Sequence, residues 1–144
     1  MIIREARPED CEAVLPLATA LATSFVVEPA AFRVSFKEIV SSDSSLVLVA
    51  EFDSAAVGYL LGFDHVAFFA NGRVATVEEI FVEPARRGTG MGKALMRKFE
   101  EWAESRDSAQ VVVATRRASA FYLALGYEDT ATCFKTVLKE KAQP

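Results

Sequence analysis

Residues 83–93 read Glu-Pro-Ala-Arg-Arg-Gly-Thr-Gly-Met-Gly-Lys, and they join two segments of different periodicity. The apolar run before them, residues 77–82, is typical of a strand, and residues 94–105 after them have the apolar spacing of a helix. Glycines at every second position let the backbone approach another group without interference from a Cβ atom. Such a turn directs free N–H groups and the positive end of a helix dipole toward one point. The stretch therefore predicts an anion site, most often one for phosphate.

Two common phosphate-binding templates do not fit this stretch. The ATP-binding P-loop needs Ser or Thr after its Gly-Lys pair, but Ala94 follows here, and Arg87 stands where the first glycine should be. The dinucleotide fingerprint needs G-x-G-x-x-G in the first strand-turn-helix unit of a fold. In this chain the spacing is G-x-G-x-G and the unit comes late, so the motif disfavours both ATP and NAD as the ligand.

Two motifs together resemble those of a known family. Arg87-x-x-Gly90-x-Gly92, after the run 80–82 and Pro84, resembles the acyl-coenzyme A signature of the GNAT superfamily of N-acetyltransferases. Residues 118–127, Ala-Ser-Ala-Phe-Tyr-Leu-Ala-Leu-Gly-Tyr, resemble a later motif of that family. The resemblance is firm over residues 46–138 and loose before them. It implies an α/β, GNAT-like acyl-CoA N-acyltransferase fold: a central mixed, mostly antiparallel twisted sheet with helices on both faces and two splayed parallel strands.

Length and composition favour one domain over residues 1–144. Hydrophobic residues make up 51% of the chain and the net charge is −4, which permits a packed core and argues against a nucleic-acid partner. Cys11 and Cys133 match neither a zinc nor a disulfide spacing, and His65 is the only histidine, so no metal site is expected. The chain starts without a signal-peptide pattern and lacks an apolar run of about 18 residues. A cytoplasmic protein with no membrane partner is therefore expected.

Hydrophobic periodicity predicts the elements of the N-terminal half. A strand is expected at residues 2–5, followed by a helix from Pro8 that Pro16 kinks or interrupts and by a second helix that starts at Pro29. Further strands are expected at residues 46–51, 57–68 and 76–82. A type I′ turn at Asn71-Gly72 would pair the last two of these strands antiparallel.

The C-terminal half predicts a helix, a parallel strand and a short helix. The apolar stripe Met91, Leu95, Phe99 and Trp102 is expected to pack on the sheet. The Val-rich run 110–114 reads as a strand buried on both faces, parallel to the strand ending at Val82. A helix at 119–125 capped by Gly126, a closing strand at 132–138 and a frayed tail at 139–144 complete the expected order.

The resemblance implies three kinds of contact with coenzyme A. Residues 87–93 are expected to hold the pyrophosphate, mainly through main-chain amides. Residues 80–82 are expected to offer main-chain hydrogen bonds to the pantetheine amides and the thioester carbonyl. Thr115 stands where members often have asparagine, so its hydroxyl would give a weaker contact. The expected cofactor-binding residues are Ile80, Phe81, Val82, Arg87, Gly88, Thr89, Gly90, Met91, Gly92, Lys93 and Thr115.

Tyr122 corresponds to the family tyrosine that protonates, or hydrogen-bonds to, the departing thiolate of coenzyme A. A phenol has a pKa of about 10 and a thiol one of about 8.5, so full proton transfer costs about 2 kcal/mol in water. Tyr122 must therefore stabilise developing charge in a drier site or have a lowered pKa.

Glu78 and Glu79 lie in an apolar strand, where carboxylates are rare without a partner. Adjacent strand residues face opposite sides, so one of them is expected to face the cleft. That carboxylate would bind an ammonium ion, with a pKa of about 10.4, and remove its proton directly or through water. The alternative is an ion pair with an arginine. Asp64 and His65 are further candidates to line the acceptor pocket.

The leading hypothesis is an N-acetyltransferase that moves an acetyl group from acetyl-coenzyme A (acetyl-CoA) to a primary amine by direct attack and without a metal. The acceptor is a small molecule or a peptide or protein amine, and the resemblance also implies a homodimer. The alternative is a non-catalytic acyl-CoA-binding or sensing module on the same fold. A third hypothesis, a nucleotide-phosphate protein of another fold, predicts that ATP or NAD competes with coenzyme A.

Overall fold

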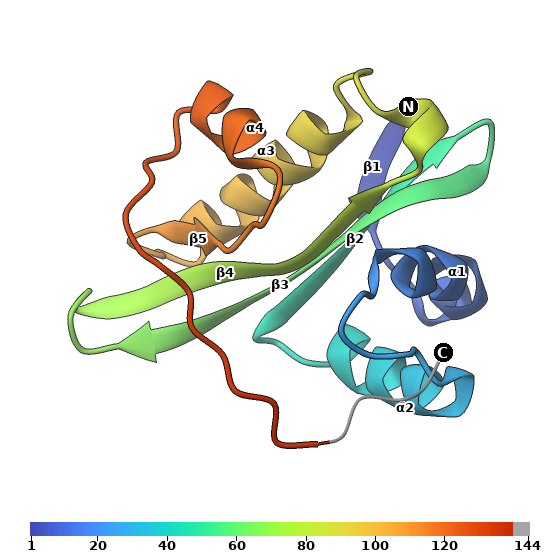
Figure 1. Ribbon diagram of the computed structural model, residues 1–144, viewed down its shortest axis with the longest axis horizontal. Helices are drawn as coiled ribbons and strands as arrows, with labels where there is room; N and C mark the ends of the chain where they lie inside the picture. The colour runs from blue at the N-terminus through green and yellow to red at the C-terminus, as the bar shows by residue number, and fades with distance from the viewer. Residues whose placement is uncertain (140–144) are drawn as a thin grey trace.

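The computed structural model describes residues 1–139, and the rest of the expected frayed tail lies outside the described residues. Figure 1 shows a sheet between two helical layers, with α3 and α4 on one face and α1 and α2 on the other. None of the helices in residues 1–139 has both the length and the apolar character that a membrane crossing requires. The elements are β1 (Ile2–Glu5), η1 (Pro8–Asp10), α1 (Cys11–Leu21), α2 (Pro29–Val40), β2 (Ser45–Phe52), β3 (Ala55–Ala67), β4 (Gly72–Val82), η2 (Pro84–Arg86), α3 (Met91–Ser105), β5 (Val111–Val113) and α4 (Ser119–Ala124).

Within residues 1–139 the sheet has five strands in the order β1-β2-β3-β4-β5. The first four pair antiparallel with their neighbours. β5 instead pairs parallel with β4, after the crossover through α3. The predicted fold class, a mixed and mostly antiparallel sheet with helices on both faces, is confirmed.

Each face of the sheet carries its own apolar cluster. Leu95, Met96 and Phe99 of α3 pack on one face, which confirms that the predicted helical stripe is core. Val14 and Leu17 of α1 pack on the other face together with α2 residues. Because α3 is fixed by its apolar stripe, its N-terminus is held at the end of β4.

Gly62 of β3 allows the ring of Phe99 to lie directly against the sheet. A Cβ atom built on Gly62 would lie 2.1 Å from Cε1 of Phe99, a side chain that is fully buried. Gly62→Ala is therefore expected to lower the free energy of unfolding by about 1–3 kcal/mol through overpacking. Urea denaturation followed by circular dichroism measures the change, and an unaltered midpoint would show that the ring can move aside.

α1 continues through Pro16, so of the two predicted effects of this proline, a kink or an interruption, the interruption does not occur. Proline removes one N–H donor, which leaves the carbonyl of Glu12 without its helical partner. Glu12 lies in the exposed first turn, where water can hydrate that carbonyl. The helix therefore tolerates the proline near its start.

The β3–β4 connection is a hairpin, but its turn differs from the predicted type I′ turn. Ala67 pairs with Gly72, so residues 68–71 form the turn, and the N–H of Asn71 donates to the carbonyl oxygen of Phe68 at 3.2 Å. Asn71 adopts a left-handed φ of 57°. The buried residues of the two strands set the register here, and the turn adapts to it.

The C-terminal part departs most from the expected order. β5 has only three residues and Val112 is 41% exposed, so the prediction of a strand at 110–114 buried on both faces is wrong. Residues 132–138 form no strand, so the predicted closing strand is also wrong. This segment runs past the sheet toward α2 (Figure 1), where Lys135 Nζ donates to Ser24 Oγ at 3.0 Å. An edge of three residues offers too few hydrogen bonds to offset the entropy lost in ordering a further strand.

Candidate functional site

β4 and β5 diverge at a bulge in β4. Their parallel pairing ends at Val77 and Val113, whereas β4 continues to Val82. On the other side of β4, Gly62 pairs with Val77 and Leu61 with Glu79, which leaves Glu78 as an extra residue. A bulge bends its strand and increases the local twist. The β5 side of β4 is therefore uncovered from residue 79 to residue 82.

The alternation of main-chain groups determines which atoms of this open edge are available. The N–H of Glu83 donates to the carbonyl oxygen of Val57 at 2.9 Å, so Phe81 also directs its main-chain groups toward β3. Ile80 and Val82 direct theirs to the open edge. The Val82 carbonyl already accepts a hydrogen bond of 2.9 Å from Arg87 Nε. Of the three strand residues expected to contact a cofactor, Ile80 and Val82 thus have the suitable orientation.

The loop between β4 and α3 presents a row of main-chain amides. Gly88 and Gly90 have φ angles of 76° and 88°, and no atom lies within 4 Å of a Cβ built on either, so the loop faces open space. The N–H of Ala94 makes the first helical hydrogen bond, to Gly90, which leaves the amides of residues 91–93 without helical acceptors. Within residues 1–139, no protein acceptor binds the N–H groups of residues 88–90 either. Six successive N–H groups, those of residues 88–93, are therefore unpaired within the described residues, at the N-terminal, positive end of the α3 dipole, as an anion site requires.

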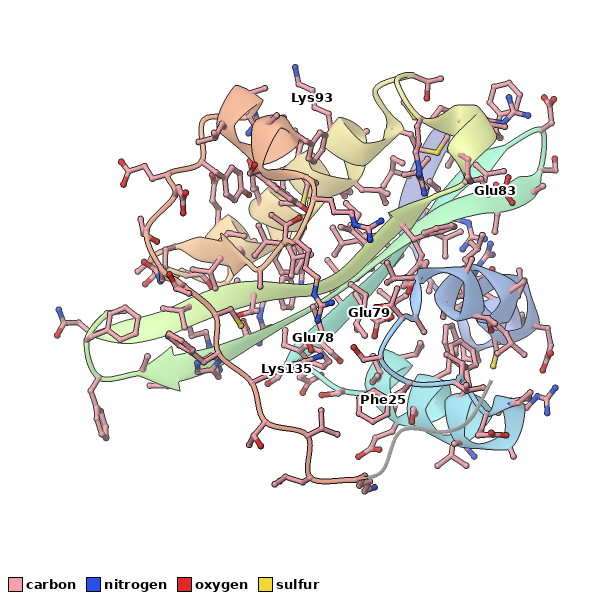
Figure 2. All side chains as sticks on the ribbon, in the orientation of Figure 1. Phe25, Glu78, Glu79, Glu83, Lys93 and Lys135 are labelled. Carbon is pink, nitrogen blue, oxygen red and sulfur yellow. The ribbon has the colours of Figure 1, made fainter. Side chains whose placement is uncertain are left out.

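Aromatic rings hold the two arginines of this loop. The Arg86 guanidinium carbon lies 3.9 Å from the ring centroid of Phe52, and that of Arg87 lies 5.5 Å from the centroid of Phe81. In the described part of the chain, neither guanidinium forms an ion pair. Figure 2 shows Lys93 pointing away from the first turn of α3 into solvent. Arg86, Arg87 and Lys93 thus add positive charge beside the row of amides, and within residues 1–139 no carboxylate forms an ion pair with either arginine.

Tyr122 lies on α4 and is 7% exposed. Its ring packs against Phe121 and Tyr127, with centroids 5.0 Å and 5.8 Å away. Burial raises the pKa of the Tyr122 hydroxyl, which favours the first of the two alternatives, stabilisation of developing charge in a drier site. Within residues 1–139 the hydroxyl has no hydrogen-bond partner, yet it is not sealed from solvent. Tyr122 is therefore a neutral donor that is free to bind a ligand.

Contacts between α3 and α4 hold Phe121, the neighbour of Tyr122, against the first turn of α3. A Cβ atom on Gly92 would lie 3.3 Å from Cζ of Phe121, so the glycine allows the two helices to approach closely. The Tyr127 hydroxyl donates to Glu100 Oε2 at 2.6 Å and ties the end of α4 to α3. A hollow of about 1050 Å³ opens between α3, β5 and α4, and both Tyr122 and Thr115 line it. Thr115 Oγ1 accepts the N–H of Ala118 at 3.0 Å, which leaves its own hydroxyl hydrogen available to a ligand.

Glu79 has a buried tyrosine as its partner. The Tyr59 hydroxyl donates to Glu79 Oε1 at 2.6 Å, and Tyr59 is 2% exposed within the cluster that packs against α1 and α2. Burial, and then the charge of Glu79, raise the pKa of Tyr59 well above its usual range. The alternative of an ion pair with arginine does not hold for Glu79 within residues 1–139. Sequence reasoning missed Tyr59, although it lies diagonally across the hairpin from Glu79.

Glu78, the extra residue of the bulge, is exposed. Figure 2 shows the labelled Glu78 and Glu79 together at the middle of β4, on the side of the sheet where α1 and α2 lie. The prediction that they face opposite sides is wrong, because a bulge cancels the strict alternation of a strand. Both residues belong to the bulged part of β4, beside the divergence of β4 and β5.

Asp64 and His65 do not belong to this site. The Asp64 side chain is fully buried and binds Arg73 Nη1 at 3.2 Å, Arg106 Nη2 at 3.2 Å and Arg106 Nε. His65 is exposed opposite Val74, in the part of the hairpin that extends beyond its pairing with β2. Asp64 is thus a structural residue, and the expectation that it lines the acceptor pocket is wrong.

Comparisons with known proteins agree with this geometry. A family model described as the acetyltransferase (GNAT) family matches residues 10–127. A glucosamine 6-phosphate N-acetyltransferase from Oryza sativa subsp. japonica is 33% identical over 120 residues, which cover 78% of this chain and 72% of that protein. An uncharacterised N-acetyltransferase from Archaeoglobus fulgidus is 38% identical over 73 residues, so the chain matches half the length of that relative and half of its own.

The fold is also that of a solved complex. The structure of AAC(6')-Iy, determined with the bisubstrate analog CoA-S-monomethyl-acetylneamine, has a TM-score of 0.82 to this chain. The two chains are 22% identical, and the alignment covers 96% of this chain and 97% of the other. At this identity the likeness is one of fold.

Proposed function

This chain belongs to the GNAT acetyltransferase family, and on that premise we propose that it transfers an acetyl group from acetyl-CoA to a primary amine by direct attack. The observation that carries the proposal is the divergence of β4 and β5 directly beside the amide row of residues 88–93. Coenzyme A is an extended molecule with two amides in its pantetheine arm and a diphosphate beyond them. The open edge at residues 79–82 would suit the amides, and the free N–H groups of residues 88–93 would suit the diphosphate. Tyr122 and the two carboxylates then supply the chemistry at the other end of that path.

The residues present fit coenzyme A as follows. The amides of Gly88, Thr89, Gly90, Met91, Gly92 and Lys93 would bind the diphosphate, with Arg87 adding positive charge. Ile80 and Val82 would bind the pantetheine amides through their outward main-chain groups, as in strand addition, and the Phe81 side chain supports Arg87. Thr115 would donate from the hollow beside β5. When bound, acetyl-CoA supplies a thioester whose sulfur is a good leaving group.

The acidic pair Glu78 and Glu79 would select a cationic acceptor. A primary amine is protonated at neutral pH, and it attacks a thioester only after losing that proton. A carboxylate at the divergence of the strands can bind the ammonium and then accept its proton, directly or through water. The acceptors proposed are small amines such as amino sugars and polyamines, and peptide amines.

Tyr122→Phe is expected to lower kcat by about 10- to 100-fold and to leave the affinity for coenzyme A within about twofold. The phenol, whose pKa is raised by burial, stays protonated and donates a hydrogen bond to the negative charge that develops on sulfur. The phenylalanine keeps the packing against Phe121 and Tyr127 but lacks the donor. Steady-state kinetics and calorimetry check the two parts separately, and an unchanged kcat would remove Tyr122 from the mechanism.

The experiment that tests the proposed function combines calorimetry with a turnover assay. Acetyl-CoA is mixed with the protein and a panel of amino sugars, polyamines and peptides, and thiol release is followed. Release that depends on one class of amine is the expected result. Tight binding of acetyl-CoA without release for any amine would instead indicate a non-catalytic sensor. Full competition by ATP or NAD would indicate a nucleotide-binding protein.

A further inference from the structure

We propose that Tyr59 is a positioning residue for the acceptor site: its hydroxyl holds one oxygen of Glu79, so that the other oxygen is presented to the incoming ammonium. This inference rests on the proposed function, because it concerns the same carboxylate. It adds a residue from β3, the strand whose expected pocket residues, Asp64 and His65, do not belong to the site.

The hydroxyl that makes this contact is rigid. Tyr59 is 2% exposed, and its ring is enclosed by the apolar cluster that contains Val49 and Leu61. Its hydroxyl donates to Oε1 of Glu79 at 2.6 Å, a short, charge-assisted hydrogen bond. Within residues 1–139, Oε2 of Glu79 has no protein partner, and the side chain is half-buried and open to solvent. One oxygen is therefore fixed and the other is available.

The bulge at Glu78 makes this pairing possible. Val77, Ile80 and Val82 pack against the α3 side of the sheet, whereas Glu79 meets Tyr59 on the opposite side. With regular alternation, Glu79 would share the face of Val77 and could not reach Tyr59. The extra residue moves Glu79 to the other face at the position where β4 leaves β5. The distortion that opens the strand edge thus also gives Glu79 its partner.

The chemical role of Tyr59 follows from the steps of the transfer. Glu79 Oε2 accepts a proton from the ammonium, directly or through one water, and the freed lone pair forms the new C–N bond to the thioester carbon. The C–S bond breaks, and its electron pair goes to sulfur, whose negative charge the Tyr122 hydroxyl stabilises. The nitrogen then gives up its second proton, which passes through water to the thiolate, so the products are the amide and the free thiol. The proton on Glu79 then passes to water. Because Tyr59 fixes the direction of the carboxylate, Oε2 is already aligned when the amine arrives.

The first test compares Tyr59→Phe, Glu79→Gln and the double variant with a protonated primary amine as acceptor. Tyr59→Phe is expected to lower kcat about tenfold, the effect of losing one hydrogen bond to a charged group, without a change in the KM for acetyl-CoA. The double variant is expected to be no slower than Glu79→Gln, because Tyr59 acts only through Glu79. Additive losses would overturn the proposal.

Matched controls separate positioning from general loosening of the structure. Arg33→Gln breaks the contact between Arg33 and Glu12, which joins α2 to α1 on the same face of the sheet, and it is expected to leave kcat unchanged. Glu79→Asp keeps the charge but draws the carboxylate away from Tyr59, so it is expected to show the same tenfold loss. Full activity of Glu79→Asp would overturn the proposal even if Tyr59→Phe failed to fold.

The second test uses hydroxylamine, an acceptor that is already neutral at neutral pH. Its attack needs no proton transfer from an ammonium, so Tyr59→Phe and Glu79→Gln are expected to stay within about twofold of the native rate. Equal losses with hydroxylamine and the protonated amine would show that Tyr59 only maintains the fold, and the positioning role would be rejected. Failure of the proposed function itself is recognised separately, because the native protein would then release no thiol above the protein-free rate with either acceptor.

Discussion

Gly90→Val is expected to weaken coenzyme A binding at least about 100-fold while the chain remains folded. Gly90 has a φ of 88°, a region in which a β-branched residue costs about 1–3 kcal/mol. The loop would relieve this strain by changing its backbone angles, which would reorient the amides of residues 88–93. The valine methyl groups would also occupy the open space in front of the loop, where no protein atom lies within 4 Å. Isothermal titration calorimetry with coenzyme A measures the loss.

The chain offers a matched control for this substitution at Asn71. Asn71 also has a left-handed φ, of 57°, but it lies in the turn between β3 and β4, outside the loop that enters α3. Asn71→Val is expected to strain the backbone in the same way and to leave coenzyme A affinity unchanged. If Gly90→Val bound coenzyme A as the native chain does, the amide row would not be the diphosphate site.

Asp64→Ala is expected to lower the free energy of unfolding by about 3 kcal/mol. Breaking a buried ion pair by removing one partner usually costs about 3–5 kcal/mol, and the lower value applies because Arg73 and Arg106 are themselves 36% and 26% exposed. Asp64 is fully buried and joins the β3–β4 hairpin to the C-terminal end of α3. Arg106 also stacks on Trp102, with its guanidinium carbon 5.0 Å from the ring centroid. Without the carboxylate, Arg73 and Arg106 both lose their hydrogen-bond acceptor.

Urea denaturation provides the measurement, and Glu12→Ala is the control. Glu12 pairs with Arg33, but both side chains are more than half exposed, so this substitution is expected to leave the midpoint unchanged. If Asp64→Ala moved the midpoint no further than Glu12→Ala does, the buried bridge would not contribute to stability.

The features that were predicted correctly depend on residues that lie close together in the sequence. The glycines at 88, 90 and 92 predicted a turn between a strand and a helix, and the structure has such a turn between β4 and α3, with left-handed φ angles at Gly88 and Gly90. The stripe Met91, Leu95 and Phe99 requires a buried face, and all three residues are buried. The parallel relation of β4 and β5 follows from the handedness of the crossover through α3.

The features that were missed or wrong depend on residues far apart in the sequence. The bulge at Glu78 arises from the register between β3 and β4, which the pattern of residues 76–82 alone does not contain. Without the bulge, the side of Glu79 and its bond to Tyr59 could not be deduced. The closing strand at 132–138 was wrong for a similar reason: its residues favour a strand, but pairing depends on an edge, and β5 has only three residues. Pro16 shows the reverse case, in which a local rule failed because the surroundings of Glu12 let water replace the lost donor.

The divergence of β4 from β5 has a consequence for handling the ligand-free protein. Unpaired strand edges are templates for aggregation, because another chain can add to them. From residue 79 to residue 82, β4 exposes such an edge in the middle of its own sheet, although its short length and the adjacent bulge limit how many bonds an intruding chain could form. An occupant that pairs with Ile80 and Val82 would cover it. Concentrated stocks kept with coenzyme A should therefore remain clear longer than stocks without it.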